Sequence, residues 1–235
     1  MIFETSIFIP TKKSWLNFTL SEKLTFYSLF TTFICCMILI INQKHFQIES
    51  IESILKPLTI IVFLIVIIGN IIRFWEYENL NGSFKGRLKI DLDSISIDNN
   101  EYIFSDIENL KMTVSNYKGQ RTNNTKSGPS FYQGTSNFIS FTHNSKELSI
   151  NFLLTSKDHI DDLYHILVSI ITEEKINYSR NLINLIPDRY RKSQEFKSFI
   201  LKLIIEKRVE CTEGLLIHGY SSDEEAKQLR AKYCS

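Results

Sequence analysis

Two long apolar stretches near the start of the chain dominate the pattern of hydrophobic and polar residues. Leu24–Ile41 and Pro57–Ile72 contain no charged residue. A helix of roughly 20 apolar residues spans the hydrocarbon core of a bilayer. The second stretch reaches that length because Arg73 can extend to the headgroups while Trp75 lies at the interface. The pattern predicts a hairpin of two transmembrane helices, 24–41 and 57–75, rather than two buried helices of a soluble core.

Basic residues flank the predicted hairpin on the side of both chain ends. They are Lys12, Lys13 and Lys23 before the first helix and Arg73, Lys85, Arg87 and Lys89 after the second. The predicted connecting loop, 42–56, holds Lys44 and Lys56 together with Glu49 and Glu52. Cytoplasmic flanks of membrane helices carry an excess of Lys and Arg. Both termini are therefore expected in the cytoplasm.

Apolar and polar residues alternate one by one between Phe84 and Leu154. Strict alternation is typical of antiparallel strands with one buried face. Turn signals occur at Asn99-Asn100 and Asn144-Ser145. The pattern predicts about six short strands that form a small antiparallel barrel or sandwich. An apolar stripe at helical spacing over 157–174 predicts a helix that caps this sheet.

The predicted fold is thus a membrane α-helical hairpin joined to an α+β soluble domain. The segments are an N-terminal cytoplasmic or interfacial segment (1–23), the hairpin (24–75), a cytosolic β domain (82–175) and a mostly helical C-terminal extension (176–235). The first segment either lies along the headgroups or adds a strand to the β domain. In the extension, Phe196 to Ile204 form a helical stripe, and Leu215–Ile217 are compatible with a short strand.

Composition and cysteine content add little to this picture. The chain is 43% hydrophobic with a net charge of +1, which are ordinary values for a globular protein. The near-zero net charge gives no general argument for nucleic-acid binding. Four cysteines without CxxC spacing favour neither a disulfide framework nor a zinc site. Cys35 and Cys36 lie within the first apolar stretch, whereas Cys211 and Cys234 lie in the extension.

The order of elements carries a resemblance to known protein families. Strands over Phe84–Leu154 and a helix over Lys157–Glu174, directly after a two-helix hairpin, resemble a pleckstrin-homology-like domain of bacterial membrane proteins. The arrangement also resembles the small membrane effectors of bacterial anti-phage systems. In that group a cytosolic β-barrel senses a nucleotide signal and the membrane part disrupts or permeabilises the inner membrane. The resemblance implies a multi-pass protein of the bacterial inner (plasma) membrane.

The sequence contains none of the common catalytic or nucleotide-binding motifs, such as GxGxxG, a P-loop, HExxH or GxSxG. The five histidines are scattered, so neither a metal site nor a cofactor is expected. Asp91 and Asp93 are a possible catalytic carboxylate pair, but no base or nucleophile accompanies them. We interpret them as a solvated edge, and an enzyme is not expected.

Two basic patches are candidate binding surfaces. The first is a loop, Asn116–Asn137, in which basic and aromatic residues suit contact with phosphates and stacking on bases. Its candidate ligand-binding residues are Tyr117, Lys118, Arg121, Lys126, Phe131 and Tyr132. The alternative is a mobile polar loop. The second patch suits anionic lipid headgroups and comprises Arg73, Trp75, Arg189, Arg191 and Lys192, unless the last three are a solvated helix start.

Small and polar residues within the apolar stretches are candidates for helix packing or for lining a pore. They are Ser28, Thr31, Thr32 and Cys35 in the first stretch and Asn70, beside Gly69, in the second. Such residues let membrane helices approach closely and form hydrogen bonds. Packing is the simpler interpretation, and a hydroxyl-lined pore in an oligomer is the alternative.

These features together predict an oligomeric inner-membrane effector or ion channel. Its β domain would bind a cytosolic signal, a nucleotide or oligonucleotide, and thereby open the hairpins of a homo-oligomer. The alternative is a membrane-anchored scaffold whose PH-like domain docks a lipid or a protein partner encoded nearby, without channel activity.

Overall fold

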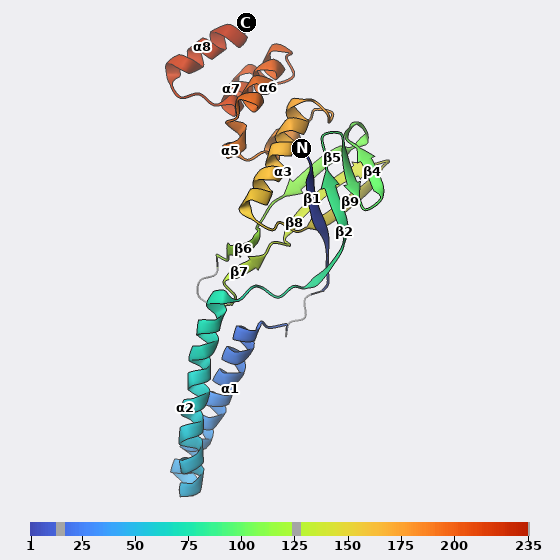
Figure 1. Ribbon diagram of the computed structural model, residues 1–235. Helices are drawn as coiled ribbons and strands as arrows, with labels where there is room; N and C mark the ends of the chain where they lie inside the picture. Colours follow the sequence, from blue (N-terminus) through green and yellow to red (C-terminus); the bar gives the residue numbers. More distant parts are fainter. Residues whose placement is uncertain (13–16, 124–127, 235) are drawn as a thin grey trace. The chain divides into compact units, whose positions relative to one another are not determined.

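The computed structural model describes residues 1–12, 17–123 and 128–234. It divides the chain into two compact units (Figure 1). The hairpin unit comprises Ile9–Ser83 and Asn116–Ser136. The sheet unit comprises Met1–Phe8, Phe84–Ser115 and Asn137–Ser235. The segment Asn116–Ser136, which follows strands of the sheet unit in the sequence, thus belongs to the unit that contains the two apolar helices.

The hairpin unit is built on two long antiparallel helices. Helix α1 (Leu20–Ile41) continues as a short π-helical turn over Asn42–Phe46. Helix α2 (Glu49–Ile72) ends in a single 3₁₀ turn over Arg73–Trp75. Gln47, in the left-handed region at φ 52°, lies between the two helices. The chain therefore reverses with almost no loop.

The second helix begins earlier than the sequence predicted. Residues 42–56 were expected to form the loop, but Glu49, Glu52 and Lys56 are all helical and Pro57 lies inside α2. The charged residues end the apolar stretch without ending the helix, because Lys56 pairs with Glu52 one turn away. The boundary of an apolar run is therefore a poor guide to the boundary of this helix.

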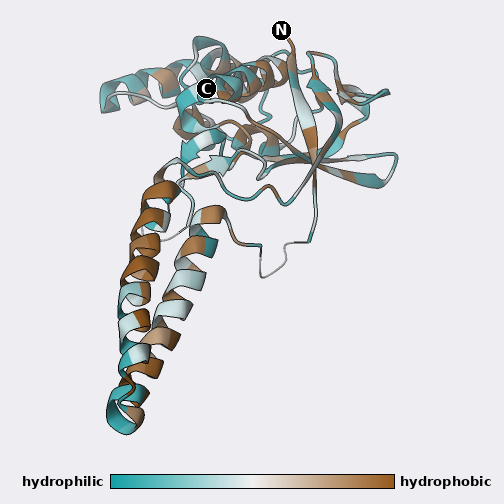
Figure 2. Cartoon of the chain, turned by 60° about the horizontal axis from the view of Figure 1, so that its bottom comes forward, coloured by the Kyte–Doolittle hydropathy of each residue, from teal (hydrophilic) through white to brown (hydrophobic). Residues whose placement is uncertain are grey.

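Both helices are long and apolar enough to cross a membrane. The candidate spans are Leu20–Phe46 and Glu49–Trp75, each of 27 residues, and only 11% of each apolar window is buried. Figure 2 shows apolar residues along most of α2, apolar residues mixed with weakly polar ones along α1, and polar residues at the connecting tip. Large side chains such as Phe30 and Phe33 are 58% and 64% exposed. The helices of a soluble core would bury such side chains.

The sheet unit contains a seven-stranded sheet in the order β4-β3-β2-β1-β9-β8-β5. Its strands are β1 (Phe3–Pro10), β2 (Gly82–Ile90), β3 (Ser94–Ile97), β4 (Asn100–Ile103), β5 (Glu108–Thr113), β8 (Asn137–His143) and β9 (Lys146–Phe152). Turns at Asp98-Asn99 and Asn144-Ser145 join the predicted hairpins. The pairings that define the order run from β4 to β5 in an open series, so the described residues form no closed barrel.

The seventh strand comes from the N-terminal segment. Strand β1 lies in the middle of the sheet, with Ile7 opposite Phe152 and Phe8 opposite Asn151 on β9. Phe3, Thr5 and Ile7 alternate with more exposed residues, as the pleat of a half-buried strand requires. Of the two alternatives for this segment, residues 3–10 adopt the strand.

Helix α3 (Lys157–Thr172) supplies much of the core of the sheet unit. Ser156 caps its first turn by accepting a hydrogen bond from the His159 N–H. Seven of its residues are buried, among them Leu163, Ile166 and Leu167. Its contact with β1 includes the His159 ring, which stacks 4.6 Å from the ring of Phe3.

The C-terminal extension is helical throughout its regular elements. These are α4 (Arg180–Asn184), α5 (Asp188–Arg191), α6 (Gln194–Ile205), α7 (Cys211–His218) and α8 (Asp223–Tyr233). The predicted stripe is confirmed, since Phe196, Ile200 and Leu203 on α6 are fully buried. The strand considered for Leu215–Ile217 is wrong, because these residues belong to α7, whose Glu210 cap accepts a hydrogen bond from the Glu213 N–H.

The structure also corrects the interpretation of the cysteines. A disulfide joins Cys211 at the start of α7 to Cys234 after α8, with their Cα atoms 5.7 Å apart. Cys35 and Cys36 remain free thiols. The two cysteines lie 23 positions apart, at the start of α7 and after α8, and form no short spacing motif. The disulfide therefore could not be predicted from the spacing of the cysteines.

Candidate functional site at the base of the helical hairpin

Small residues at heptad spacing form the contact between α1 and α2. Ser21, Ser28 and Cys35 are the buried residues of α1, and Val62 and Gly69 are those of α2. A Cβ atom on Gly69 would lie 2.9 Å from Thr25 Oγ1 and 3.3 Å from the Ser21 carbonyl oxygen. The two backbones therefore approach closely at Gly69, as small residues allow in membrane helices.

The candidate pore residues separate into two groups. Ser28 and Cys35 lie in the contact between the helices, and the Thr32 hydroxyl is buried without a hydrogen-bond partner among the described residues. Thr31 and Asn70 lie on the exposed surface of the hairpin. Asn70 donates a hydrogen bond to the Val66 carbonyl within its own helix. Only the exposed pair is available to a neighbouring hairpin.

A carboxylate clamp joins the two helices at the end where the chain enters α1 and leaves α2. Glu76, just beyond α2, accepts hydrogen bonds from the Ser21 backbone N–H at 3.2 Å and from the Ser21 hydroxyl. The first turn of α1 carries a capping box, because the Thr19 hydroxyl and the Glu22 carboxylate each accept a hydrogen bond from the other residue's backbone N–H. Two carboxylates thus satisfy N–H groups at the positive end of the α1 dipole.

A small β-hairpin docks on the segment that leaves α2. It consists of β6 (Lys118–Arg121) and β7 (Phe131–Gln133). The Phe131 N–H donates to the Glu76 carbonyl, and the Glu78 N–H donates to the Phe131 carbonyl. The rings of Tyr77 and Phe131 lie 5.4 Å apart. The predicted binding loop is therefore an ordered part of the hairpin unit, apart from residues 124–127, which lie outside the described residues.

A polar pocket of about 330 Å³ opens between these pieces, and we call it the hairpin-base pocket. It is lined by Asn17, Thr19, Glu22, Glu78, Asn79, Asn81, Thr122, Gly128, Pro129 and Tyr132. The three asparagines hold the two chain segments together, since Asn79 donates to the Asn17 carbonyl and Asn17 donates to the Asn81 side chain. Amides, hydroxyls, the carboxylates of Glu22 and Glu78 and one aromatic ring suit a small polar ligand with a flat face.

The structure brings only part of the predicted ligand set to this pocket. Tyr132 lines the pocket, while Phe131 is used in docking against Tyr77. Tyr117 is half-buried, and its N–H donates to the Gln120 side chain. Lys126 lies outside the described residues.

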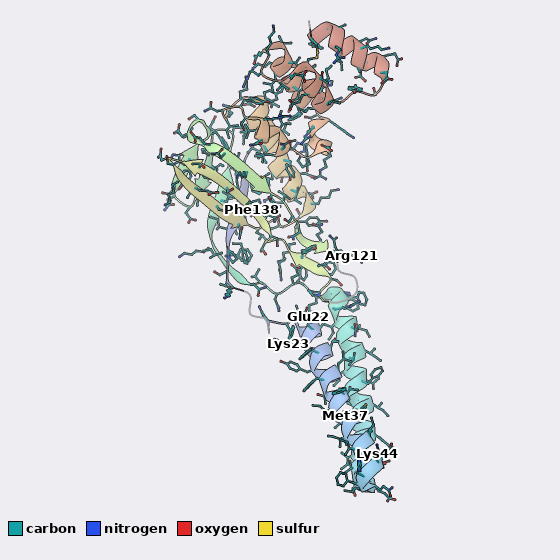
Figure 3. The ribbon with its side chains drawn as sticks, turned by 180° about the vertical axis from the view of Figure 1, so that it is seen from behind. Glu22, Lys23, Met37, Lys44, Arg121 and Phe138 are labelled. Carbon is teal, nitrogen blue, oxygen red and sulfur yellow. A yellow bond between two sulfur atoms is a disulfide. The ribbon has the colours of Figure 1, made fainter. Side chains whose placement is uncertain are left out.

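Two cations lie on β6 beside the pocket. Lys118 and Arg121 are exposed, and neither has an ion-pair partner in the described part of the chain. Arg121 directly precedes Thr122 of the pocket wall. Figure 3 shows Arg121 at the end of the hairpin that holds Glu22 and Lys23, whereas Lys44 lies at the opposite end.

The candidate lipid-binding residues belong to two different units. Arg73 and Trp75 form the last turn of α2, and Trp75 is 71% exposed. Arg189 is paired with Asp161 and Arg191 with Asp188 in the sheet unit, while Lys192 is exposed. Burial and the hydrogen bond to Asp161 raise the pKa of the neighbouring Tyr190.

Apart from Tyr132, the residues that build the clamp and the pocket were not predicted from the sequence. Glu76, Asn17, Asn79 and Asn81 lie in segments without a periodic pattern, and their contacts link positions far apart in the chain. The only local signal was the density of asparagine on both sides of the hairpin. Among the described residues, no cluster of three or more His, Cys, Asp or Glu side chains is arranged to hold a metal ion.

Comparison of this chain with protein-family models, with curated proteins and with solved structures found no match.

Proposed function

We propose that this protein is an oligomeric effector of the bacterial inner membrane, gated by a nucleotide that binds at the hairpin-base pocket. The observation that carries the proposal is the composition of that pocket. Residues of the basic-aromatic loop and the capped start of α1 line the same space. A ligand there would touch the helix that enters the membrane.

The membrane location is supported by the exposed apolar surface of the hairpin. Side chains such as Phe26, Phe30 and Phe33 are more than half exposed along α1. Contiguous apolar surface of this extent is unstable in water and matches a lipid environment. The excess of Lys and Arg beside Leu20 and Trp75 supports a cytoplasmic location for both termini.

The chemistry of the pocket suits a nucleotide in two parts. Neutral amides and hydroxyls read the edge of a base by hydrogen bonds, and Tyr132 offers a ring for stacking. Lys118 and Arg121 lie on the adjoining strand and can pair with phosphate oxygens. The pocket volume of about 330 Å³ lies near the lower end of the range for ligand sites, which begins at roughly 300 Å³.

Gating would act through the Glu76 clamp. The carboxylate of Glu76 holds the N-terminus of α1, and the backbone of the same residue holds β7. A ligand that binds better to one arrangement of these pieces shifts the population toward that arrangement. Exposed Thr31 and Asn70 would then contact neighbouring hairpins or line the path of ions.

We extend the proposal to the resemblances to pleckstrin-homology-like domains and to anti-phage membrane effectors. Antiparallel strands followed by α3 support assignment of the sheet unit to the pleckstrin-homology-like type. The combination of that unit with an apolar hairpin supports a place among the membrane effectors of anti-phage systems.

Nucleotide binding tests the proposal directly. The full chain in detergent is titrated calorimetrically with a panel of mononucleotides and cyclic di- and trinucleotides. We expect one of them to bind, with affinity reduced at least about tenfold in Tyr132→Ala, since stacking contributes about 1–3 kcal/mol. Tyr220→Ala, an exposed tyrosine outside the hairpin unit, is the matched control. Equal affinity of all three proteins, or no binding, would reject the nucleotide site.

A scaffold is the second candidate function, favoured by apolar side chains exposed on the C-terminal helices. Ile205 is 60% and Leu216 is 66% exposed. Exposed apolar groups on a soluble surface suit docking of a protein partner. A stable partner recovered with the wild type, and lost in Leu216→Ser, would favour the scaffold if no nucleotide binds.

A further inference from the structure

Helix α8 is fixed to the rest of the sheet unit at both of its ends. At the N-terminal end a short connector leads from Gly219, at φ 72° with nothing within 4 Å of its position for a Cβ atom. At the C-terminal end the disulfide joins Cys234 to Cys211 of α7. We infer that this cysteine pair is a reversible thiol–disulfide site and that its reduction releases α8 about the Gly219 connector.

The side-chain packing of α8 is too sparse to hold it in place alone. None of the residues Asp223–Tyr233 is buried. A hydrogen bond from Arg230 to the Thr212 hydroxyl, at 3.1 Å, is a polar contact between α8 and α7. Hollows of about 710 Å³ and about 220 Å³ lie along α8, where tight packing would leave none. The covalent bond is therefore the main attachment of its C-terminal end.

Release would leave α8 helical, because its first turn is capped by its own residues. Ser222 accepts a hydrogen bond from the Glu225 N–H, and the Glu225 carboxylate accepts hydrogen bonds from Ser221. These Ser221 hydrogen bonds lower the pKa of Glu225. The change on reduction is thus a movement of an intact helix, which uncovers the buried Leu215 of α7.

The two sulfur atoms lie in different electrostatic environments. Cys211 is the first residue of α7, where the positive end of the helix dipole stabilises a thiolate. Cys234 follows the last turn of α8, where the dipole has the opposite sign. Both line the larger hollow together with Lys207, Lys232 and Glu210, so a small thiol can reach the bond. Cys211 is consequently the better leaving group.

Reduction by a dithiol then follows a defined order. A thiolate of the reductant attacks Cys234 Sγ, the Cys211–Cys234 bond breaks, and Cys211 leaves as a thiolate that takes up a proton. The second thiolate of the reductant attacks the other reductant sulfur, which is bonded to Cys234 Sγ in the mixed disulfide. Cys234 leaves as a thiolate and is protonated in turn. Two electrons pass from the dithiol to the protein, and the reductant leaves as a disulfide.

Proteolysis of the full chain in detergent tests the inference. The Cys211–Cys234 disulfide is formed with oxidised glutathione or reduced with dithiothreitol. Alkylation and mass spectrometry map the thiol state of the protein. Trypsin cleavage is then followed at Lys227 and Arg230. We expect cleavage in α8 to be roughly tenfold faster after reduction, because local opening controls access. Cleavage at Lys146 in the sheet is the internal control and should not change.

A variant and a second readout sharpen this test. Cys211→Ser/Cys234→Ser should be cleaved at the reduced rate under both conditions. In the reduced wild type, iodoacetamide should modify Cys211 several times faster than Cys234. Equal cleavage of α8 in the bridged and reduced proteins, or failure of oxidised glutathione to form the bond, would overturn the inference. It concerns α6–α8 alone and is independent of the nucleotide proposal.

Discussion

Gly69 is a residue at which α1 and α2 approach closely. A larger side chain there would meet Thr25 Oγ1, Leu24 Cβ and the Ser21 carbonyl oxygen, all within 3.3 Å of the added Cβ position. Gly69→Leu should therefore separate the helices and destabilise the hairpin by about 1–3 kcal/mol. Thermal unfolding in detergent measures the loss. Ile68→Leu, at an exposed neighbouring position, is the control, and an equal unfolding temperature for both variants would contradict the close approach.

Asn42 closes the opposite end of the hairpin. It is 2% exposed, donates to the Ile48 carbonyl at 3.0 Å and accepts from the Ile48 N–H at 3.2 Å. Asn42→Ala should cost about 1–3 kcal/mol, because the two hydrogen bonds of the buried Asn42 side chain are lost. Chemical unfolding in detergent checks this value. Gln43→Ala, exposed on the same turn, should remain within about 0.5 kcal/mol of the wild type.

The turn between β2 and β3 depends on an ionised carboxylate. Asp91 accepts hydrogen bonds from the Asp93 and Ser94 N–H groups at 3.1 and 2.8 Å. Burial alone would raise the pKa of Asp91, but these hydrogen bonds and Lys89 lower it below its ordinary value. The folded-state pKa is depressed, so the stabilisation is complete above about pH 4 and is lost as pH falls through the lower folded value.

Urea unfolding between about pH 6 and about pH 2.5 tests this element. The stability difference between the wild type and Asp91→Asn should be largest near neutral pH and shrink in acid, because the neutral side chain cannot lose its charge. Asp162→Asn, at an exposed position on α3, should follow the pH dependence of the wild type. A difference that grows in acid would contradict the assigned sign.

Elements with a local signal could be predicted from the sequence, and elements fixed by distant partners could not. Strict alternation located β3, β5, β8 and β9, and apolar patterns located the two long helices and α3. Strand β1 depends on pairing with β9, which lies more than a hundred residues away. Its amphipathic pattern is equally compatible with a membrane surface, so the sequence left both alternatives open.

The candidate site could be predicted only in part for the same reason. The basic-aromatic composition of 116–137 drew attention to Tyr132, Lys118 and Arg121. This segment docks on Glu76 and Glu78 through backbone hydrogen bonds. Such bonds do not depend on side-chain type, so the sequence does not predict them. The early start of α2 was not predicted, because Glu49 and Glu52 lie outside the uncharged apolar stretch. Acidic residues nevertheless favour the N-terminus of a helix. Asp91 and Asp93 lie in a turn, after the end of β2, and serve local structure.

For the whole molecule, the central proposal is that a nucleotide at the hairpin-base pocket controls the membrane hairpin. A single hairpin is too small to form a conducting path, so activity requires assembly of several chains. The proposal joins three observations in one unit: an exposed apolar hairpin, a carboxylate clamp at its base and a polar pocket that shares residues with both the loop and α1.

Ion flux from proteoliposomes tests this claim most directly. Purified full-length protein is reconstituted in vesicles of phosphatidylethanolamine and phosphatidylglycerol, and release of a trapped potassium indicator is recorded as each nucleotide of the panel is added. We expect one nucleotide to raise the flux in the wild type and in Tyr220→Ala, with a concentration dependence that shifts at least about tenfold in Tyr132→Ala. Flux that is absent with every nucleotide, or that is unchanged by Tyr132→Ala, would contradict it.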